Sequence, residues 1–159
     1  MSEAFVPVKF RVSLGDYKEG MMYLLEPETA KVLWKIGAIE VIDELTRVIG
    51  EVDRAIMEEK ESEPLTELPK NLYERVEFWI WYAENYVREN APNTDAIATK
   101  LAMLATLKKK VRTLRTLRLR KIMNAAMLRP HSEGIFARLT PEEAEVYEYL
   151  SDVAERWLE

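Results

Sequence analysis

Ten lysines and arginines stand between residues 96 and 131 of this 159-residue chain, and no aspartate or glutamate lies among them. They are Lys100, Lys108, Lys109, Lys110, Arg112, Arg115, Arg118, Arg120, Lys121 and Arg129. Such a run can bind two kinds of anion, the phosphates of a nucleic acid or the carboxylates of an acidic protein segment. The other 13 of the 23 basic residues and all 28 acidic residues lie elsewhere, so the chain carries two blocks of opposite charge.

Residue types that carry catalysis or bind transition metals are scarce. The chain has no cysteine and one histidine, His131. This composition excludes disulfides, thiol nucleophiles and cysteine-ligated metals, and it argues against a histidine-rich metal site or a catalytic triad. No P-loop, dinucleotide fingerprint, nucleophile elbow or EF-hand spacing occurs. We therefore expect no enzyme activity, no catalytic residue, no metal and no cofactor, and we interpret His131 as a loop residue.

The basic run is expected to lie on one long helix. Residues 95–128 contain no glycine or proline, and apolar residues recur there at helical spacing. A helix of this length extends about 50 Å at ~1.5 Å per residue, and Asn93 or Thr94 is expected to cap it. Three cations project onto its apolar side: Lys108, Arg115 and Arg118. An unpaired charge there is costly to bury, so these cations need carboxylates nearby.

Three interpretations of the basic helix are open. Acidic neighbours, such as the Glu-rich helix predicted over residues 44–60, neutralise it within a bundle or across an interface; nucleic acid binds it; or water solvates it. The candidate nucleic-acid contacts are Lys109, Lys110, Arg112 and Arg120. A pI near 5.2 and the lack of an aromatic stacking motif count against a dedicated DNA binder.

Two more helices are predicted in this part of the chain. Apolar spacing predicts a helix over residues 71–90, and a helix from residue 140 runs almost to the C-terminus. Thr140, Pro141 and Glu143 fit a capping box at its start. Its predicted buried side chains are Tyr147, Leu150, Val153, Ala154 and Trp157. Residues 58–63 are interpreted as a solvated acidic run and residues 129–139 as a loop with one helical turn.

The first forty-odd residues predict a small β-rich unit with one helix. Residues 6–14 alternate between apolar and polar types, which is typical of a half-buried strand. Residues 21–25 predict a second, more fully buried strand, residues 27–36 a helix ended by Gly37, and residues 38–42 a third strand. The chain is thus expected to be mainly α, with a β-rich domain over residues 1–43 and a helical domain over residues 44–159.

Aromatic residues supply further interface candidates. Phe78 and Trp81 fall on the polar side of their helix, where they either pack under the N-terminal unit or anchor a partner protein. Trp157 is expected in the core, with an interface as the alternative. The candidate partner contacts are therefore Phe78, Trp81, Lys108, Arg115, Arg118 and Trp157. No apolar run is long enough to span a membrane and no secretory signal is seen, which places the protein inside the cell.

Three segments of the helical part resemble GINS subunits, replisome factors of archaea and eukaryotes. Residues 65–73 (LTELPKNLY) are similar to the leucine-proline-tyrosine start of the GINS helical domain, and residues 114–122 (LRTLRLRKI) to its arginine-rich central helix. Residues 139–143 (LTPEE), with Tyr147 and Leu150 after them, are similar to its last helix. The order and spacing of these segments carry the resemblance.

The resemblance implies a helical A domain and a small β-rich B domain. Here the β-rich unit comes first, as in the smaller archaeal type, the counterpart of the eukaryotic second and third partner subunits. It further implies a non-enzymatic scaffold in the cytoplasm, associated with the nucleoid. Two copies would join two copies of a sister subunit, and this tetramer would bind the MCM helicase and a RecJ-family protein and stimulate unwinding. The rival hypotheses are a stand-alone nucleic-acid-binding regulator that uses the basic helix and, third, a small enzyme.

Overall fold

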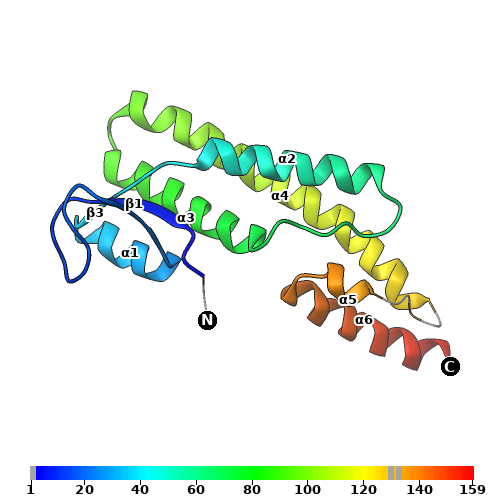
Figure 1. The fold of residues 1–159 in the computed structure, drawn as a ribbon. Coiled ribbons are helices and arrows are strands. Elements are labelled where there is room, and N and C mark those ends of the chain that lie inside the picture. The colour runs from blue at the N-terminus through cyan, green and yellow to red at the C-terminus, as the bar shows by residue number, and fades with distance from the viewer. Residues whose placement is uncertain (1–2, 129–130, 132–133) are drawn as a thin grey trace. The chain divides into compact units, whose positions relative to one another are not determined.

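The computed structural model describes residues 3–128, 131 and 134–159. The chain divides into two compact units, Met1–Thr46 and Arg47–Glu159, and Figure 1 shows the elements of both. The described strands all belong to the first unit, and the second unit is helical. A small antiparallel sheet followed by a helical bundle with one long helix is the predicted fold class, which the structure confirms.

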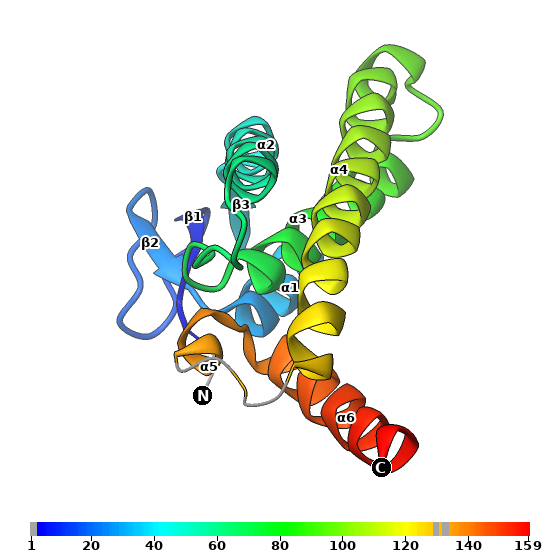
Figure 2. The same cartoon turned by 90° about the vertical axis from the view of Figure 1, so that its right-hand side faces the viewer.

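Antiparallel pairing builds the sheet of the first unit. The central strand β1 (Val6–Phe10) pairs with β2 (Met22–Leu25) on one side and with β3 (Ile39–Val41) on the other, an order that Figure 2 shows. Helix α1 (Pro27–Lys35) connects β2 to β3 and packs against the sheet. Gly37 follows α1 with a φ of 79°, a left-handed conformation that favours glycine, so the predicted helix end is confirmed.

The alternation of β1 defines the buried face of this sheet. Three side chains are buried, as predicted: Val6, Val8 and Phe10. The predicted strand over residues 6–14 is nevertheless too long, because β1 ends at Phe10 and the chain then turns back, with Leu14 bridged to Tyr17. Val12 and Leu14 are consequently exposed.

The edge strand β2 corrects a second prediction. Residues 21–25 were expected to be more fully buried, but Met22 and Leu24 are exposed and only Leu25 of this strand is buried. A short run of apolar residues looks alike in a strand covered on both faces and in one covered on a single face. At the edge of a three-stranded sheet, one face of β2 has no covering element among the described residues of its own unit.

The second unit contains five helices within its described residues: α2 (Leu45–Glu61), α3 (Leu72–Asn90), α4 (Thr94–Met127), α5 (Ile135–Arg138) and α6 (Pro141–Leu158). The first residues of α2 belong to the preceding unit. The four long helices match the predicted helices to within two residues at each end. The short α5 is the single turn expected in the loop over residues 129–139, of which residues 129–130 and 132–133, and with them Arg129, lie outside the described part.

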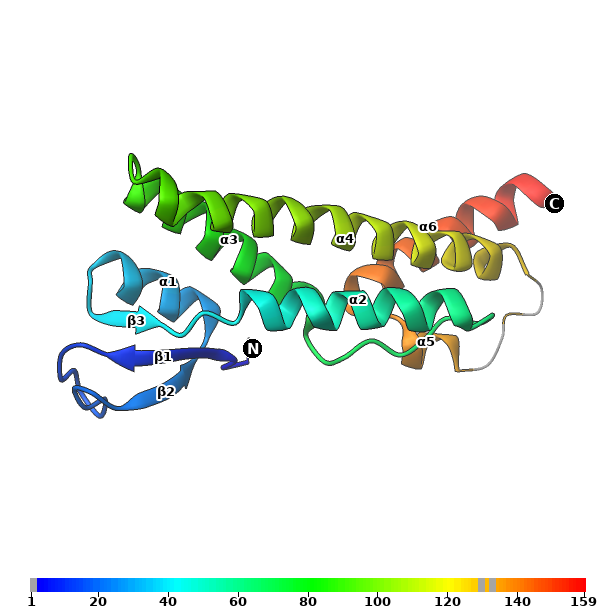
Figure 3. The same cartoon turned by 90° about the horizontal axis from the view of Figure 1, so that it is seen from above.

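Helix α4 contacts the helices α2, α3 and α6 of its unit. It runs unbroken for 34 residues. Asn93 caps its start, as predicted, because the Asn93 side chain accepts a hydrogen bond from the backbone N–H of Ala96 at 3.1 Å. Its buried residues recur every three or four positions: Leu104, Leu107, Val111, Leu114, Arg118, Ile122 and Ala126. Helices α3 and α6 pack against it, and α2 lies alongside it, joined by ion pairs, as Figure 3 shows.

The capping box predicted at the start of α6 is present. The backbone N–H of Glu143 donates to the Thr140 hydroxyl at 3.2 Å, and that of Thr140 donates to the Glu143 carboxylate at 3.0 Å. Toward the other end of α6 the predicted burial is wrong, because Val153 is 45% exposed and Trp157 is 85% exposed. Among the described residues, no helix combines the length and the apolar character that a membrane crossing requires.

Candidate functional site

The centre of the helical unit is a buried guanidinium. Arg118 of α4 is 0% exposed, and its Nε and Nη2 donate to the two carboxylate oxygens of Glu143 at 2.7 and 2.8 Å. Its Nη1 donates to Glu59 at 2.7 Å and to the carbonyl of Thr66 at 2.8 Å, and Nη2 also donates to the carbonyl of Arg138 at 2.9 Å. One side chain thus connects α2, the segment before α3, α5 and the cap of α6.

Sequence reasoning did not single out one of these carboxylates, although it named the helix over residues 44–60 as an acidic neighbour of the basic helix. Glu59 was interpreted as part of a solvated acidic run, but it is 1% exposed. It also accepts hydrogen bonds from the Thr66 hydroxyl at 2.7 Å and from Lys121 Nζ at 2.6 Å. A signal was available, since Glu59 follows the buried Val52 and Ile56 of α2 at helical spacing and therefore lies on the same face.

The buried charges hold one another ionised. Burial alone raises the pKa of Glu59, but hydrogen bonds from Lys121, Thr66 and Arg118 outweigh it and lower that pKa below its ordinary 4.5. Burial likewise opposes ionisation of Glu143, and the hydrogen bonds from Arg118 and from the Thr140 backbone lower its pKa. The pKa of Arg118 is raised because its bonds to the two carboxylates outweigh burial. Glu59, Glu143 and Arg118 are therefore charged together at neutral pH.

Lys121 fastens the end of α2 to α4. Its Nζ donates to the carbonyls of Glu59 and Ser62, at 2.7 and 2.6 Å, as well as to the Glu59 carboxylate. The last carbonyls of a helix have no partners within it, so an ammonium group there satisfies groups that burial would otherwise strand. Lys110 of α4, a candidate nucleic-acid contact, forms an ion pair with Asp53 of α2. Its charge is therefore already matched within the chain.

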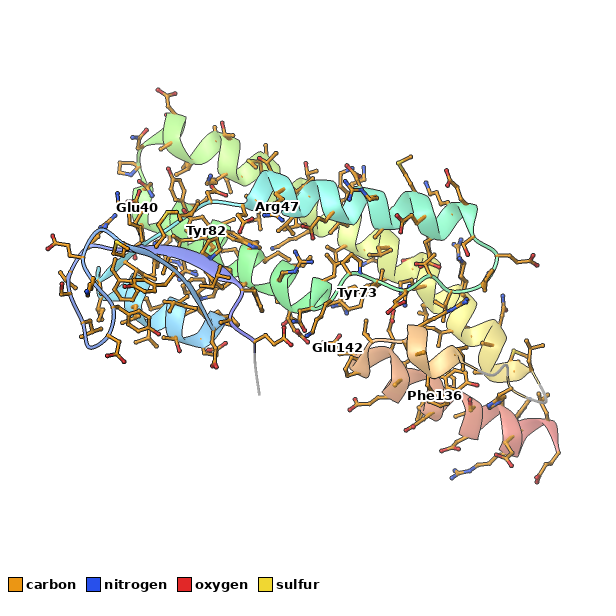
Figure 4. All side chains as sticks on the ribbon, viewed as in Figure 1. Glu40, Arg47, Tyr73, Tyr82, Phe136 and Glu142 are labelled. Carbon is orange, nitrogen blue, oxygen red and sulfur yellow. The ribbon has the colours of Figure 1, made fainter. Side chains whose placement is uncertain are left out.

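The remaining cations of α4 are more exposed. Lys108 lies 3.3 Å from Glu84 of α3, and Arg115 lies 3.7 Å from Glu142 of α6. The Arg115 guanidinium also stacks over the ring of Tyr73, at 4.4 Å from the ring centroid. Figure 4 labels Tyr73 and Glu142, which lie where the start of α3 meets the start of α6. The expectation that Lys108, Arg115 and Arg118 have carboxylates nearby is confirmed, although only Arg118 is buried.

Three of the candidate nucleic-acid contacts differ from Lys110. For Lys109, Arg112 and Arg120, the described residues provide no carboxylate within ion-pair distance. All three are exposed. They are the cations of α4 that an anion from outside the chain can reach without displacing a partner.

The aromatic candidates separate into buried and exposed side chains. Phe78 is 1% exposed, and its ring contacts those of Trp79 and Trp81 at centroid distances of 5.1 and 5.8 Å. A ring this buried has no surface to offer a partner, so Phe78 serves in packing. Trp81 is half-buried. Trp157, expected in the core, is the most exposed of the candidates.

Helix α6 presents an apolar strip beside its buried face. Four residues form it, at spacings of three and four: Val146, Tyr149, Val153 and Trp157. Their exposed fractions run from 40% to 85%. On the buried face Tyr147 contacts the rings of His131 and Phe136, at 5.3 and 5.2 Å, which places His131 against a core side chain in the loop where it was expected. We call the four exposed residues the α6 strip.

The described residues include no group of three or more His, Cys, Asp or Glu side chains placed to hold a metal ion. The buried charges pair with one another, and the exposed features are cations and apolar side chains. Such an arrangement can recognise anions and apolar surfaces of other molecules.

A comparison with protein families identifies the helical unit. The family model described as the GINS complex protein helical bundle domain matches residues 48–159, which is more than half of the chain. A search of curated proteins gave no match. The matched stretch includes nearly all of α2 and the whole of α3 to α6, and with them the buried cluster around Arg118 and the capping box of α6. The chain therefore belongs to the GINS family of structural subunits in DNA replication complexes.

Proposed function

We propose that this protein is a GINS subunit of the smaller archaeal type, the counterpart of the eukaryotic second and third partner subunits. Its β-rich part over residues 1–43 would be the B domain, and its helical part over residues 44–159 the A domain. Two copies would assemble with two copies of a sister subunit. The tetramer, in the cytoplasm and associated with the nucleoid, would hold the MCM helicase and a RecJ-family protein together and stimulate unwinding, without catalysing a reaction itself.

The α6 strip is the observation that carries this proposal. Within this strip the side chain of Trp157 is 85% exposed and that of Tyr149 is 69% exposed. Apolar area left in water stabilises any association that covers it, by roughly 25 cal/mol per Å². Tryptophan and tyrosine are also the side chains that most often dominate protein interfaces. A subunit that pairs Arg118, Glu59 and Glu143 in its interior and keeps this strip exposed is suited to join another chain.

Co-expression tests the assembly directly. The chain is produced with the sister GINS subunit of the same genome, and native mass spectrometry measures the purified complex. The expected result is a complex with two copies of each chain, which then binds purified MCM. A chain that stays monomeric over a wide concentration range and ignores the sister subunit would contradict the proposal.

A second candidate function is supported by Lys109, Arg112 and Arg120. Exposed cations without carboxylate partners can contact phosphates, as a stand-alone nucleic-acid-binding regulator requires. Binding of the isolated chain to duplex DNA, weakening steeply as salt rises, would favour this candidate. Binding that requires the sister subunit would favour the scaffold.

A further inference from the structure

A shallow, wide-open groove lies on the exposed side of α4 beside Ile80 of α3. It has a volume of about 450 Å³ and is lined by Ile80 of α3 and six residues of α4: Lys108, Val111, Arg112, Arg115, Thr116 and Leu119. We call it the basic groove. A second hollow, of about 260 Å³, shares Arg115 and Leu119 with it and extends to Val146, the first residue of the α6 strip. The groove therefore continues toward an exposed apolar surface.

Three cations of the groove are weakly neutralised. Lys108, Arg112 and Arg115 follow one another at spacings of four and three, which places them on one side of the helix. The pairs to Glu84 and Glu142 are long, at 3.3 and 3.7 Å, and all four side chains are 42–58% exposed. Exposed ion pairs of this kind contribute little stability, so their carboxylates are easily exchanged. Arg112 has no carboxylate within ion-pair distance among the described residues.

Apart from Thr116, the rest of the lining is apolar. Ile80, Val111 and Leu119 lie beside the cations, and Leu119 is 42% exposed. A ligand that fills this groove must therefore present carboxylates and aliphatic groups together. From Lys108 to Arg115 the helix rises about 10 Å at ~1.5 Å per residue. A second helix lying alongside repeats that distance with carboxylates at positions i, i+4 and i+7, and apolar side chains at i+3 and i+11 share the same face.

We propose that the basic groove binds an acidic amphipathic helix of another protein, with three carboxylates against Lys108, Arg112 and Arg115 and an aliphatic side chain beside Leu119 and Val146. This inference rests on the proposed function, because it names the surface and the partner chemistry of a scaffold subunit. A nucleic acid fits the groove less well, since a phosphate backbone has no aliphatic group for Ile80, Leu119 or Val146. The unpaired Lys109 and Arg120 also lie outside the groove lining.

The first test measures the affinity of a synthetic helical peptide. The labelled peptide carries glutamates at i, i+4 and i+7 with leucines at i+3 and i+11 on the same face, and fluorescence anisotropy reports binding to the full chain. Arg112→Glu is expected to weaken binding roughly tenfold or more, whereas the matched control Arg120→Glu, an exposed cation outside the groove, changes it less than about twofold. Glutamine in place of the three glutamates should weaken binding as much as Arg112→Glu does.

The second test locates the bound peptide. Because the chain has no cysteine, Thr116→Cys introduces a single thiol in the groove and Thr113→Cys one outside its lining. The peptide should slow maleimide labelling of the first thiol and leave the second unchanged. Both positions are on the same helix, so a general change in α4 would affect the two rates alike.

Each outcome decides between the inference and its alternatives. Failure of the peptide to bind, equal loss in Arg112→Glu and Arg120→Glu, or equal protection of the two thiols overturns the inference. Displacement of the peptide by duplex DNA, with both charge reversals weakening DNA binding alike, assigns the surface to nucleic acid and also overturns it. If the chain assembles with its sister subunit but fails these tests, the proposed function stands and the groove inference falls. Absence of assembly is a separate result that refutes the proposed function.

Discussion

Helix α4 carries two groups of cations, one in contact with the interior and one exposed. Arg118 and Lys121 contact carboxylates and backbone carbonyls in or near the interior. Arg112 and Arg115 lie within one or two turns of Arg118, yet both are exposed, so helical projection assigns Arg115 to the wrong group. The direction in which a cation projects from the helix axis decides whether it stabilises the fold or faces other molecules. Burial, and not charge alone, therefore separates the structural role from the binding role.

Charge reversal at Arg118 should produce the largest effect. Arg118→Glu would place a third carboxylate between Glu59 and Glu143, with Lys121 as the one remaining cation paired with Glu59 among the described residues. Breaking a buried ion pair by removing one partner destabilises a protein by about 3–5 kcal/mol, and reversal should exceed that range. Urea denaturation followed by circular dichroism measures the free energy of unfolding.

The control for this change is Arg112→Glu, on the exposed side of the same helix. It should alter the free energy of unfolding by less than about 1 kcal/mol. Equal tolerance of the two substitutions would show that the buried cluster does not stabilise the helical unit.

Acid should destabilise the same cluster. The pKa values of Glu59 and Glu143 are lowered in the folded chain, so these groups bind protons more readily when unfolded. Their contribution to stability is thus fully present above the ordinary pKa of 4.5 and is lost as pH falls from there through the lowered folded values. The free energy of unfolding, measured from neutral pH downward, should fall steeply below that point.

The variant Glu59→Gln provides the control for the acid effect. It should be less stable at neutral pH and lose less further stability in acid, because one of the two titrating groups is gone. A wild type and a variant with parallel pH profiles would exclude Glu59 as a source of the acid sensitivity.

Removal of Trp157 should affect association more than folding. Trp157→Ser deletes the most exposed member of the α6 strip, and a central interface tryptophan commonly contributes about 2 kcal/mol or more to binding. Stability of the isolated chain should change by about 0.5 kcal/mol or less. Calorimetry with the sister subunit and thermal unfolding of the chain alone measure the two quantities. The exposed Arg156→Gln is the matched control on the same turn.

The helices were predictable because each one satisfies local rules. The capping box of α6, the cap at Asn93 and the unbroken helical spacing of α4 depend on neighbours within a few residues. The family could likewise be recognised from the order of three local segments. These features required no knowledge of distant contacts.

Burial of particular charges could not be predicted in the same way. Whether Glu59 is solvated or buried depends on Arg118, which is far from it in sequence, and on Thr66, which follows it after a turn of the chain. The opposite error occurred at Trp157, which was expected in the core but is exposed. Helical spacing shows that this residue lies on an apolar face of its helix, but it does not show whether the same chain or another molecule covers that face. Spacing identifies faces of a helix, and only the packed structure shows which neighbour each face meets.

The smallest effect should come from the exposed pair of Lys108 and Glu84. Lys108→Ala should change the free energy of unfolding by about 0.2–1 kcal/mol, and high salt should remove most of that difference, because both side chains are largely solvated. Lys121→Ala should be more damaging and less sensitive to salt, since it removes one donor from the buried Glu59 carboxylate and the ammonium that binds the carbonyls of Glu59 and Ser62. If the two substitutions proved equally damaging at every salt concentration, Lys108 would be a structural cation as Lys121 is. The weak neutralisation on which the basic groove depends would then be refuted.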